Sequence, residues 1–433
     1  GPVTLSFCQD VQAEAFDYPE SFFAPKIWHQ RRVRPDAQEL ARVVDAIKVA
    51  KRPVIVAGGG VHYSEAFDAL RSFAETHNIP VTETQAGKSA LTWDHPLNLG
   101  PIGVTGGEPA NAVCAEADLV LGVGTRFQDF TTGSWSLFAN PKRQLVSLNV
   151  AAYDAEKHGA MPLMTDARVG LEELSRALGG HAFAASVAGL KSDWFGKVDP
   201  LTDAPETNNS LATDMQVVGA VQRASRAETV VMCAAGTMPG ELHKLWKAGR
   251  PGSYHMEYGF SCMGYEIAGA MGIKMAEPTR DVICFTGDGT YLMANSEMAT
   301  AAMMGISFTV VVTNNRGYGC INRLQMGTGS AEFNNLLTHA VQAQPSAIDF
   351  TAHAASMGAT SVKVANIAEL ETALARRGDM TGPYVIVIDT DPYPSTPDGG
   401  SWWDVAVPEV STRDEVNVKR AAYEAAIKER NAQ

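Results

Sequence analysis

Two apolar runs of the kind that form buried strands constrain the fold of this chain more than any other feature. Residues 282–285 precede Gly287-Asp288-Gly289, and residues 308–313 lead into Asn314-Asn315. Asp288 and Asn315 lie 27 positions apart, which leaves room for one crossover helix between two neighbouring parallel strands. Both oxygen-bearing side chains would then emerge at the same carboxyl edge of a sheet, where open α/β sheets bind their ligands.

The side chains at this edge have the chemistry of a magnesium–phosphate site. A carboxylate and an amide carbonyl are hard oxygen ligands for Mg²⁺, which usually takes further oxygens from a bound phosphate. Gly287 and Gly289 allow the backbone to approach that phosphate closely. A Gly-Asp-Gly alone is most often a turn, and the alternative is that Asp288 only caps a helix beginning near Thr290. The combined pattern predicts Asp288 and Asn315 as magnesium ligands.

Two further segments favour a phosphorylated, two-ring cofactor. Residues 234–240 follow a predicted strand and open a helix, so backbone N–H groups around Thr237 would face an anion. The alternative for this segment is an ordinary strand–helix turn. Residues 258–264 precede a helix of small residues, and Met263 could wedge between the rings of a bent cofactor. The alternative for Met263 is core packing.

Helical and strand-like patterns alternate along the chain, which predicts an α/β protein with two parallel-sheet, helix-flanked, Rossmann-like domains. Strands are expected at residues 53–57, 81–84, 119–123, 145–149, 229–233 and 384–389, and helices at residues 37–50, 64–77, 168–178 and 214–224. The expected organisation is a terminal strand (1–7) and linker within residues 1–32, a first domain (33–182), a polar linker (183–209), a second domain (210–395) and a tail (396–433) with a helix over 415–430.

Gly58-Gly59-Gly60, after the first predicted strand, invites comparison with dinucleotide-binding turns. It lacks the Gly-x-Gly-x-x-Gly spacing and the later acidic residue of such turns, so no nucleotide is expected there.

The amino-acid composition excludes some classes of binding partner. The net charge is −13 and there is no basic run, which argues against nucleic acid and anionic membranes. No apolar stretch approaches the ~20 residues that span a bilayer. The six cysteines are scattered without a Cys-x-x-Cys pair, as expected for reduced thiols in a cytoplasmic protein.

Taken together, these motifs resemble those of the thiamine-diphosphate (ThDP) enzymes. Residues 33–182 are similar to the central domain of members related to acetolactate synthase, and residues 210–395 to the diphosphate-binding domain. The resemblance implies ThDP and Mg²⁺ as cofactors, with the Gly317 carbonyl completing the metal shell. It implies cofactor contacts by Thr237, Ser261, Met263, Gly264, Gly287, Gly289, Thr290 and Tyr318.

Other stretches narrow the resemblance to one branch of this family. Residues 84–88, 124–133, 315–324, 333–336 and 402–410 are similar to members that hydrolytically open a polyhydroxylated cyclic 1,2-dione to 5-deoxy-glucuronate in myo-inositol breakdown. A homodimer or homotetramer is expected. The loop residues expected near such a substrate are Gln85, Lys88, Arg126, Gln128, Asn322 and Arg323. An acetolactate-synthase-like carboligase and a non-catalytic ThDP-fold subunit remain alternatives.

The resemblance also implies a pyrimidine-binding domain. Residues 1–32 resemble the final strand of that domain and the linker that follows it. In the family that domain carries the glutamate that activates the cofactor, and no residue of this chain is assigned that role. The expectation is that the same or another chain supplies this domain, and that the 433 residues alone are inactive.

Overall fold

The computed structural model of the chain describes residues 3–185, 187–205 and 210–432. The chain forms two compact units, Gly1–Arg32 and Val33–Gln433. The first unit contains α1 (Gln9–Ala13) and η1 (Glu20–Phe22). The strand predicted over residues 1–7 is not formed over residues 3–7, which the structure describes. A strand is stable only when it pairs with others, and neither sheet includes this segment.

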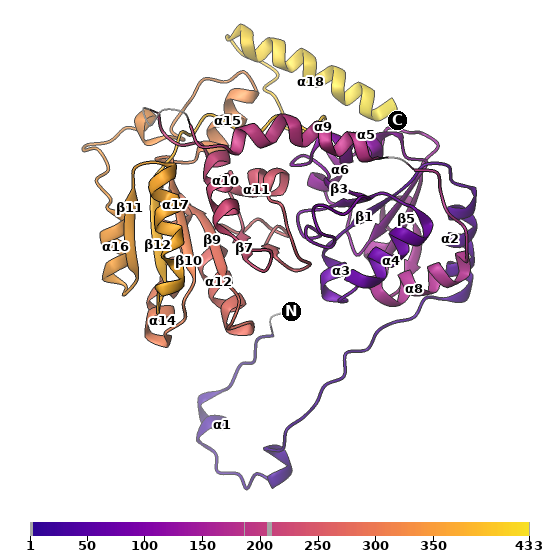
Figure 1. The fold of residues 1–433 in the computed structure, drawn as a ribbon, viewed down its shortest axis with the longest axis horizontal. Helices are drawn as coiled ribbons and strands as arrows, with labels where there is room; N and C mark the ends of the chain where they lie inside the picture. The colour runs from indigo at the N-terminus through magenta and orange to yellow at the C-terminus, as the bar shows by residue number, and fades with distance from the viewer. Residues whose placement is uncertain (1–2, 186, 206–209, 433) are drawn as a thin grey trace. The chain divides into compact units, whose positions relative to one another are not determined.

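The second unit contains two parallel six-stranded sheets, which confirms the predicted α/β class (Figure 1). The first sheet has the order β3-β2-β1-β4-β5-β6, so the chain starts in the middle and winds outward in both directions. Its strands are β1 (Pro53–Ala57), β2 (Val81–Glu83), β3 (Asn98–Pro101), β4 (Leu119–Val123), β5 (Gln144–Asn149) and β6 (Met161–Met164).

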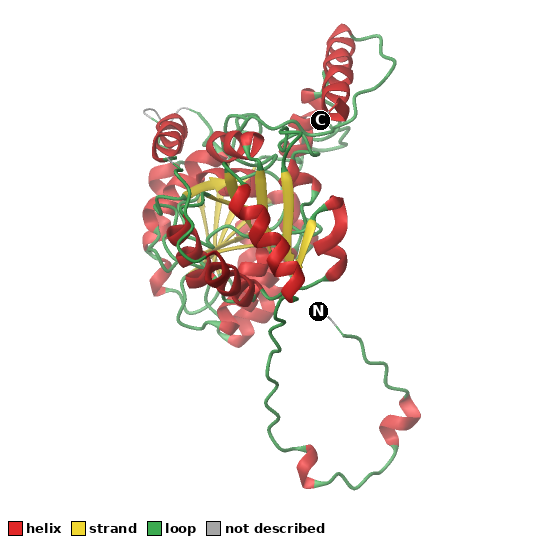
Figure 2. Cartoon of the chain, turned by 90° about the vertical axis from the view of Figure 1, so that its right-hand side faces the viewer, coloured by secondary structure: helices red, strands yellow, loops and turns green. Residues whose placement is uncertain are grey.

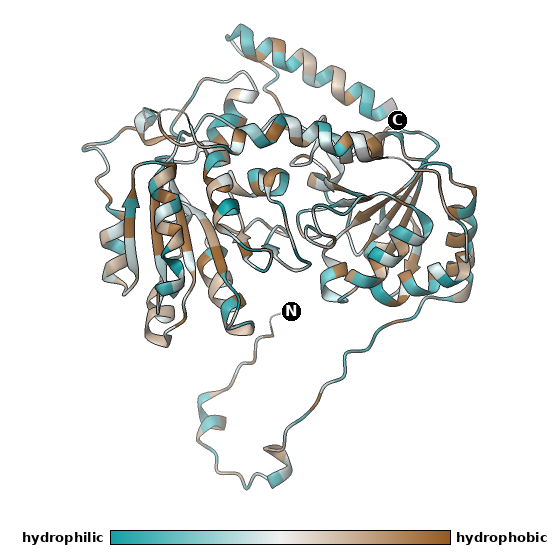
Figure 3. Ribbon diagram, in the orientation of Figure 1, coloured by the Kyte–Doolittle hydropathy of each residue, from teal (hydrophilic) through white to brown (hydrophobic). Residues whose placement is uncertain are grey.

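Helices flank the strands of the first sheet (Figure 2). They form because one face of each is apolar; in α2, for example, Val43 and Ile47 are buried while Asp36 caps the helix by accepting hydrogen bonds from two amides of the first turn. Figure 3 shows the result as hydrophobic strands beside helices with a hydrophilic side. The helical segments in this part are α2 (Ala37–Val49), α3 (Gly59–Tyr63), α4 (Phe67–His77), α5 (Glu108–Glu116), α6 (Asp129–Thr132), α7 (Ala152–Glu156), η2 (Lys157–Gly159) and α8 (Ala167–Leu178).

The second sheet has the order β11-β12-β10-β9-β7-β8. Its strands are β7 (Val230–Cys233), β8 (Tyr254–Met256), β9 (Val282–Gly287), β10 (Thr309–Asn314), β11 (Thr360–Val364) and β12 (Tyr384–Asp389). The helical segments are α9 (Ala188–Val198), η3 (Asp199–Thr202), α10 (Asp214–Ala224), α11 (Met238–Leu245), α12 (Tyr265–Ala276), α13 (Asp288–Met293), α14 (Glu297–Met304), α15 (Gly319–Gly327), η4 (Leu337–His339), α16 (Phe350–Ser356), α17 (Ile367–Ala375), η5 (Arg377–Asp379) and α18 (Asp414–Ala432).

Two segments differ from the sequence prediction. The helix expected over residues 64–77 begins only at Phe67, as α4, because Glu65 adopts φ +52°, which no helix accommodates; the separate helix α3 precedes it. The expected linker, residues 183–209, contains α9 and η3 over its described part, whereas residues 186 and 206–209 lie outside the described residues. Trp194 of α9 is buried in the core of the second sheet, which explains why this polar stretch is helical.

The triple glycine has a packing role. A Cβ atom on Gly58 would lie 2.4 Å from the Gly124 carbonyl oxygen, and one on Gly60 would lie 2.5 Å from the Gly124 Cα. The turns after β1 and β4 therefore touch backbone to backbone, which only glycine permits.

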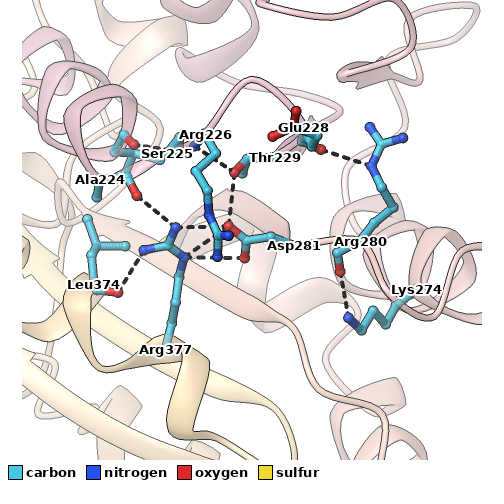
Figure 4. A network of polar contacts seen from close by, with 11 residues as sticks. Ala224, Ser225, Arg226, Glu228, Thr229, Lys274, Arg280, Asp281, Leu374 and Arg377 are labelled. Carbon is cyan, nitrogen blue, oxygen red and sulfur yellow. Dashed lines mark hydrogen bonds and ion pairs between the residues drawn. The ribbon is translucent and has the colours of Figure 1, made fainter.

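An ion pair fixes the N-terminal end of β9, opposite the edge expected to bind ligands (Figure 4). Asp281 accepts hydrogen bonds from the Arg377 guanidinium at 2.9 Å and from the Thr229 hydroxyl at 2.9 Å. Arg377 also donates to the Ala224 carbonyl at 2.7 Å, so β9, η5 and the end of α10 are joined there.

The tail after β12 returns to the first sheet. The Asn111 amide donates to the Gly399 carbonyl at 2.8 Å, and the Trp403 indole donates to Asp129 at 2.8 Å. Helix α18, which fits the helix predicted over residues 415–430, is tied to this tail because Tyr423 donates to Asp404 at 2.8 Å. No helix in the described part of the chain is long and apolar enough to cross a bilayer.

Candidate functional site

The two strands singled out by the sequence are neighbours. Strands β9 and β10 pair in parallel, with Thr313 opposite Gly287. Asp288 therefore begins α13 at the same sheet edge at which Asn315 follows β10. The predicted apposition of the two strand ends is confirmed.

Asp288 is almost fully buried, with 6% of its surface exposed. One carboxylate oxygen, Oδ2, accepts the Gly317 amide at 2.9 Å. The other, Oδ1, is buried and has no hydrogen-bond partner among the described residues. Burial raises the pKa of Asp288 to about 6, although hydrogen bonds from the Gly289 and Gly317 amides oppose the shift.

Asn315 presents a second orphan oxygen. Its Oδ1 atom is also buried without a partner in the described structure. A buried oxygen normally has a partner, and two such atoms from adjacent strand ends fit a cation that binds oxygen. No cluster of three or more His, Cys, Asp or Glu residues suited to a metal occurs within residues 3–185, 187–205 and 210–432. A metal held here would need the Asn315 amide, a main-chain carbonyl and oxygens from its ligand.

The glycines around Asp288 play different parts. A Cβ atom on Gly287 would meet nothing within 4 Å, so its surroundings are open, whereas one on Gly289 would lie 2.8 Å from the Tyr318 ring. Gly317 has φ +149°, and a Cβ atom there would lie 2.4 Å from the Asn335 carbonyl oxygen. Thr290 is buried in α13. Gly289 and Gly317 are therefore required by close packing, and Gly287 leaves space for a ligand.

Thr237 and Arg323 bring a second loop to this edge. Thr237 follows β7 and precedes α11, and its hydroxyl accepts a hydrogen bond from the Arg323 guanidinium at 2.8 Å. Arg323 lies on α15, the helix that follows Asn315 and Gly317. The turn before Thr237 contains Gly236, with φ +88° and open space where a Cβ would stand.

The segment before α12 is held against the loop after β7. The Ser261 hydroxyl donates to the Ala234 carbonyl at 3.4 Å, and Gly264 adopts φ +98° at the start of the helix. A Cβ on Gly264 would lie 2.7 Å from the Ala294 Cβ, at the end of α13. Met263, between Ser261 and Gly264, is half-buried.

Sequence reasoning missed Glu266, which joins these two segments. Its Oε1 accepts the Ala235 amide at 3.2 Å and its Oε2 accepts the Gly264 amide at 2.8 Å. Burial raises the pKa of Glu266, and the amide donors oppose that shift. The signal in the sequence was an acidic residue inside a helix otherwise made of small and apolar residues.

The predicted substrate-loop residues separate into two groups. Arg126 and Gln128 are exposed, and Arg323 is half-buried beside Thr237. Asn322 is fully buried and donates to Glu332 at 2.6 Å, and both Asn322 and Arg323 lie on a helix instead of the expected loop.

Gln85 and Lys88 are buried between the two sheets. The Gln85 amide group donates to the Pro239 carbonyl at 3.0 Å and accepts from the Tyr254 hydroxyl at 2.9 Å. The Lys88 ammonium lies 5.8 Å from the centre of the Tyr254 ring, and burial lowers its pKa to about 8, with neighbouring Glu83 opposing the shift. These two residues therefore connect the sheets.

A buried histidine also lies at this contact between the two sheets. It was not predicted from the sequence. His243 of α11 approaches the Thr105 hydroxyl at 2.9 Å through Nδ1 and the Glu83 carbonyl at 3.1 Å through Nε2. Burial lowers its pKa well below the usual range, so the ring is neutral.

Two family models match the chain over its two sheets. Residues 40–174 match the central domain of thiamine pyrophosphate enzymes, and residues 234–388 match their C-terminal TPP-binding domain. Thiamine pyrophosphate is another name for ThDP.

Curated proteins extend the similarity to nearly the whole chain. The chain is 39% identical to the 3D-(3,5/4)-trihydroxycyclohexane-1,2-dione hydrolase of Geobacillus thermodenitrificans, over 98% of this chain and 70% of that protein. It is 38% identical to the proteins of the same name from Bacillus anthracis and Bacillus cereus, over 99% of this chain and 71% of each relative.

Proposed function

The chain belongs to the thiamine-diphosphate enzymes, and from that membership we propose that it hydrolyses 3D-(3,5/4)-trihydroxycyclohexane-1,2-dione. The C–C bond between the two carbonyl carbons is cleaved with addition of water, and the ring opens to 5-deoxy-glucuronate in myo-inositol degradation. The observation that carries this proposal is the 39% identity, over 98% of the chain, to a relative named for this activity.

The residues present fit a magnesium ion beside a diphosphate. Asp288 and Asn315 offer two buried oxygens without other partners, and the Gly317 carbonyl is the proposed third protein ligand. Open backbone at Gly236 and Gly287 leaves room for phosphate oxygens. Contacts to the diphosphate are proposed for Thr237, Gly287, Gly289, Thr290 and Tyr318.

The other half of the cofactor is assigned to the segment before α12. We propose that the aminopyrimidine ring lies against Ser261, Met263 and Gly264, where Gly264 adopts a left-handed backbone conformation with φ +98°. When bound, ThDP supplies the carbon nucleophile that adds to a substrate carbonyl. The protein positions that carbon and shields it from water.

Two of the candidate substrate residues are exposed, and a third, Arg323, lies at the proposed diphosphate edge while bonded to Thr237 and to the Pro392 carbonyl. Arg126 and Gln128 are exposed, and Arg323 is a cation at the proposed diphosphate edge; the acid formed on ring opening is an anion that an arginine can bind. Gln85, Lys88 and Asn322 are instead engaged inside the protein.

The remaining parts of the proposal concern partners. We propose that a pyrimidine-binding domain, from the same or another chain, completes the site in a homodimer or homotetramer, in keeping with the family. The cytoplasmic location expected from the sequence stays a prediction.

A two-substrate assay tests the activity. The chain, joined by the pyrimidine-binding domain proposed to complete its site, is incubated with ThDP and Mg²⁺ and given either the cyclic dione or pyruvate, and products are identified by NMR. We expect loss of the dione and appearance of 5-deoxy-glucuronate only when both cofactors are present. Acetolactate from pyruvate, with the dione untouched, would instead establish a carboligase.

A further inference from the structure

Glu266 is a buried carboxyl group, and within the described structure its hydrogen bonds all come from main-chain amides. Only 1% of its surface is exposed. The Ala235 and Gly264 amides donate to its two oxygens, and the amides of Ala234 and of Glu266 itself add to the set. Within the described residues, no lysine, arginine or histidine forms an ion pair with it.

A carboxylate buried in this way is costly unless its hydrogen bonds are satisfied. A neutral side chain of the same size could not accept all of these hydrogen bonds. An ionised carboxylate only accepts hydrogen bonds, whereas a glutamine amide has one oxygen and an NH₂ group that would face another N–H. The first turn of α12 also favours negative charge. The arrangement is thus specific for the charged form of Glu266.

The amides that Glu266 holds belong to two separate segments. Ala234 and Ala235 lie between β7 and Thr237, and Gly264 directly follows Met263. The hydroxyl of Ser261 adds one more contact, to the Ala234 carbonyl at 3.4 Å. The relative placement of the two segments therefore depends largely on one side chain.

We propose that Glu266 is a positioning residue for the cofactor, which fixes the segment that carries Ser261, Met263 and Gly264 relative to the loop after β7. The inference rests on the proposed ThDP function. The proposed metal ligands Asp288 and Asn315 directly follow β9 and β10, and in the described structure neither forms a hydrogen bond with Glu266, so these two ligands do not depend on it.

Glu266→Gln tests this role with two ligands. The dissociation constants of ThDP and of inorganic pyrophosphate, each with Mg²⁺, are measured by calorimetry. Because the aminopyrimidine segment is displaced, ThDP binding should weaken by about tenfold or more, whereas pyrophosphate, which keeps the proposed ligands Asp288 and Asn315 and meets only the loop around Thr237, should lose clearly less affinity than ThDP. Glu277→Gln is the matched control, since Glu277 lies just beyond the same helix, is exposed and pairs with Arg280.

Hydrogen exchange of the protein without cofactor gives a readout independent of binding and activity. Peptides covering residues 234–240 and 258–266 should exchange faster in Glu266→Gln, and peptides covering 287–291 and 316–320 should not. Faster exchange throughout the chain would indicate a general loss of stability and would overturn the inference.

The outcomes separate the inference from the function on which it rests. If the wild-type protein binds ThDP and Glu266→Gln binds it equally well, the inference is wrong and the proposed function stands. If the wild-type protein, joined by the pyrimidine-binding domain proposed to complete its site, binds no ThDP in the presence of Mg²⁺, the proposed cofactor assignment fails, and the inference fails with it.

Discussion

The Gly317 amide donates a hydrogen bond to Asp288 at 2.9 Å, and the second oxygen of the same carboxylate is buried without a partner in the described structure. One oxygen therefore fixes the loop after β10 against the start of α13. The other remains available at the sheet edge beside the Asn315 amide oxygen. A single carboxylate thus joins the start of α13 to the loop after β10.

Asp288→Ala should abolish magnesium-dependent ThDP binding. It removes the only carboxylate proposed to contact the ion and also releases the Gly317 amide, so we expect the affinity to fall by about 100-fold or more. Calorimetric titration with ThDP and Mg²⁺ checks this, with the exposed Asp68→Ala as control. Unchanged affinity in Asp288→Ala would show that the metal assignment is wrong.

Removing the charge of Lys88, which is buried near the buried Glu83, should destabilise the protein. In Lys88→Met, Glu83 stays buried with only Lys191 as a nearby cation, and we expect a loss of about 3 kcal/mol in the free energy of unfolding. The double variant Lys88→Met/Glu83→Gln should recover most of that loss. Denaturant titration of both variants measures the difference; equal stability in the two would refute an electrostatic coupling.

The buried lysine also predicts a dependence of stability on pH. Its folded pKa is about 8, below the usual value of 10.5, so between these values the unfolded chain binds more protons than the folded one. The contribution of Lys88 to the free energy of unfolding should therefore rise as the pH increases from about 8 to 10.5. Wild type should show this rise relative to Lys88→Met. A constant difference between the two proteins across that interval would contradict the prediction.

Asp281→Ala should lower stability without affecting the cofactor. The change leaves Arg377, which is mostly buried, without its anion, and we expect a loss of about 2 kcal/mol in the free energy of unfolding. Because Asp281 precedes β9 and Asp288 follows it, the dissociation constant for ThDP should stay at the wild-type value. A large change in that constant would mean that the two ends of β9 are coupled.

The sequence alone was sufficient to predict those parts of the fold that a local pattern of residues determines. The apposition of Asp288 and Asn315 follows from two apolar runs and the length between them, because parallel strands end at a common edge. The central strands of both sheets were predicted because their residues are almost all apolar. The edge strands β3, β6, β8 and β11 were not, since β3, β8 and β11 mix polar residues or glycine with apolar ones and β6 contains a proline.

Features that depend on packing between distant segments were missed. Lys88 and Gln85 were expected in loops that face the substrate. Nothing in the neighbouring sequence indicates that Tyr254 covers them. Trp194 made a helix out of an expected linker through contacts with residues beyond position 210. Glu266 was overlooked because its partners are backbone amides, which the sequence does not distinguish from any others.

The polar contact between the two sheets limits how this protein can be recombined with its relatives. Gln85 needs the Tyr254 hydroxyl and the Pro239 carbonyl, and His243 needs Thr105 and the Glu83 carbonyl. A chimera that takes its central part from one relative and its C-terminal part from another would bury mismatched donors and acceptors at this boundary. A chimera that keeps both sides of this boundary from the same relative should therefore fold more stably than one that divides them.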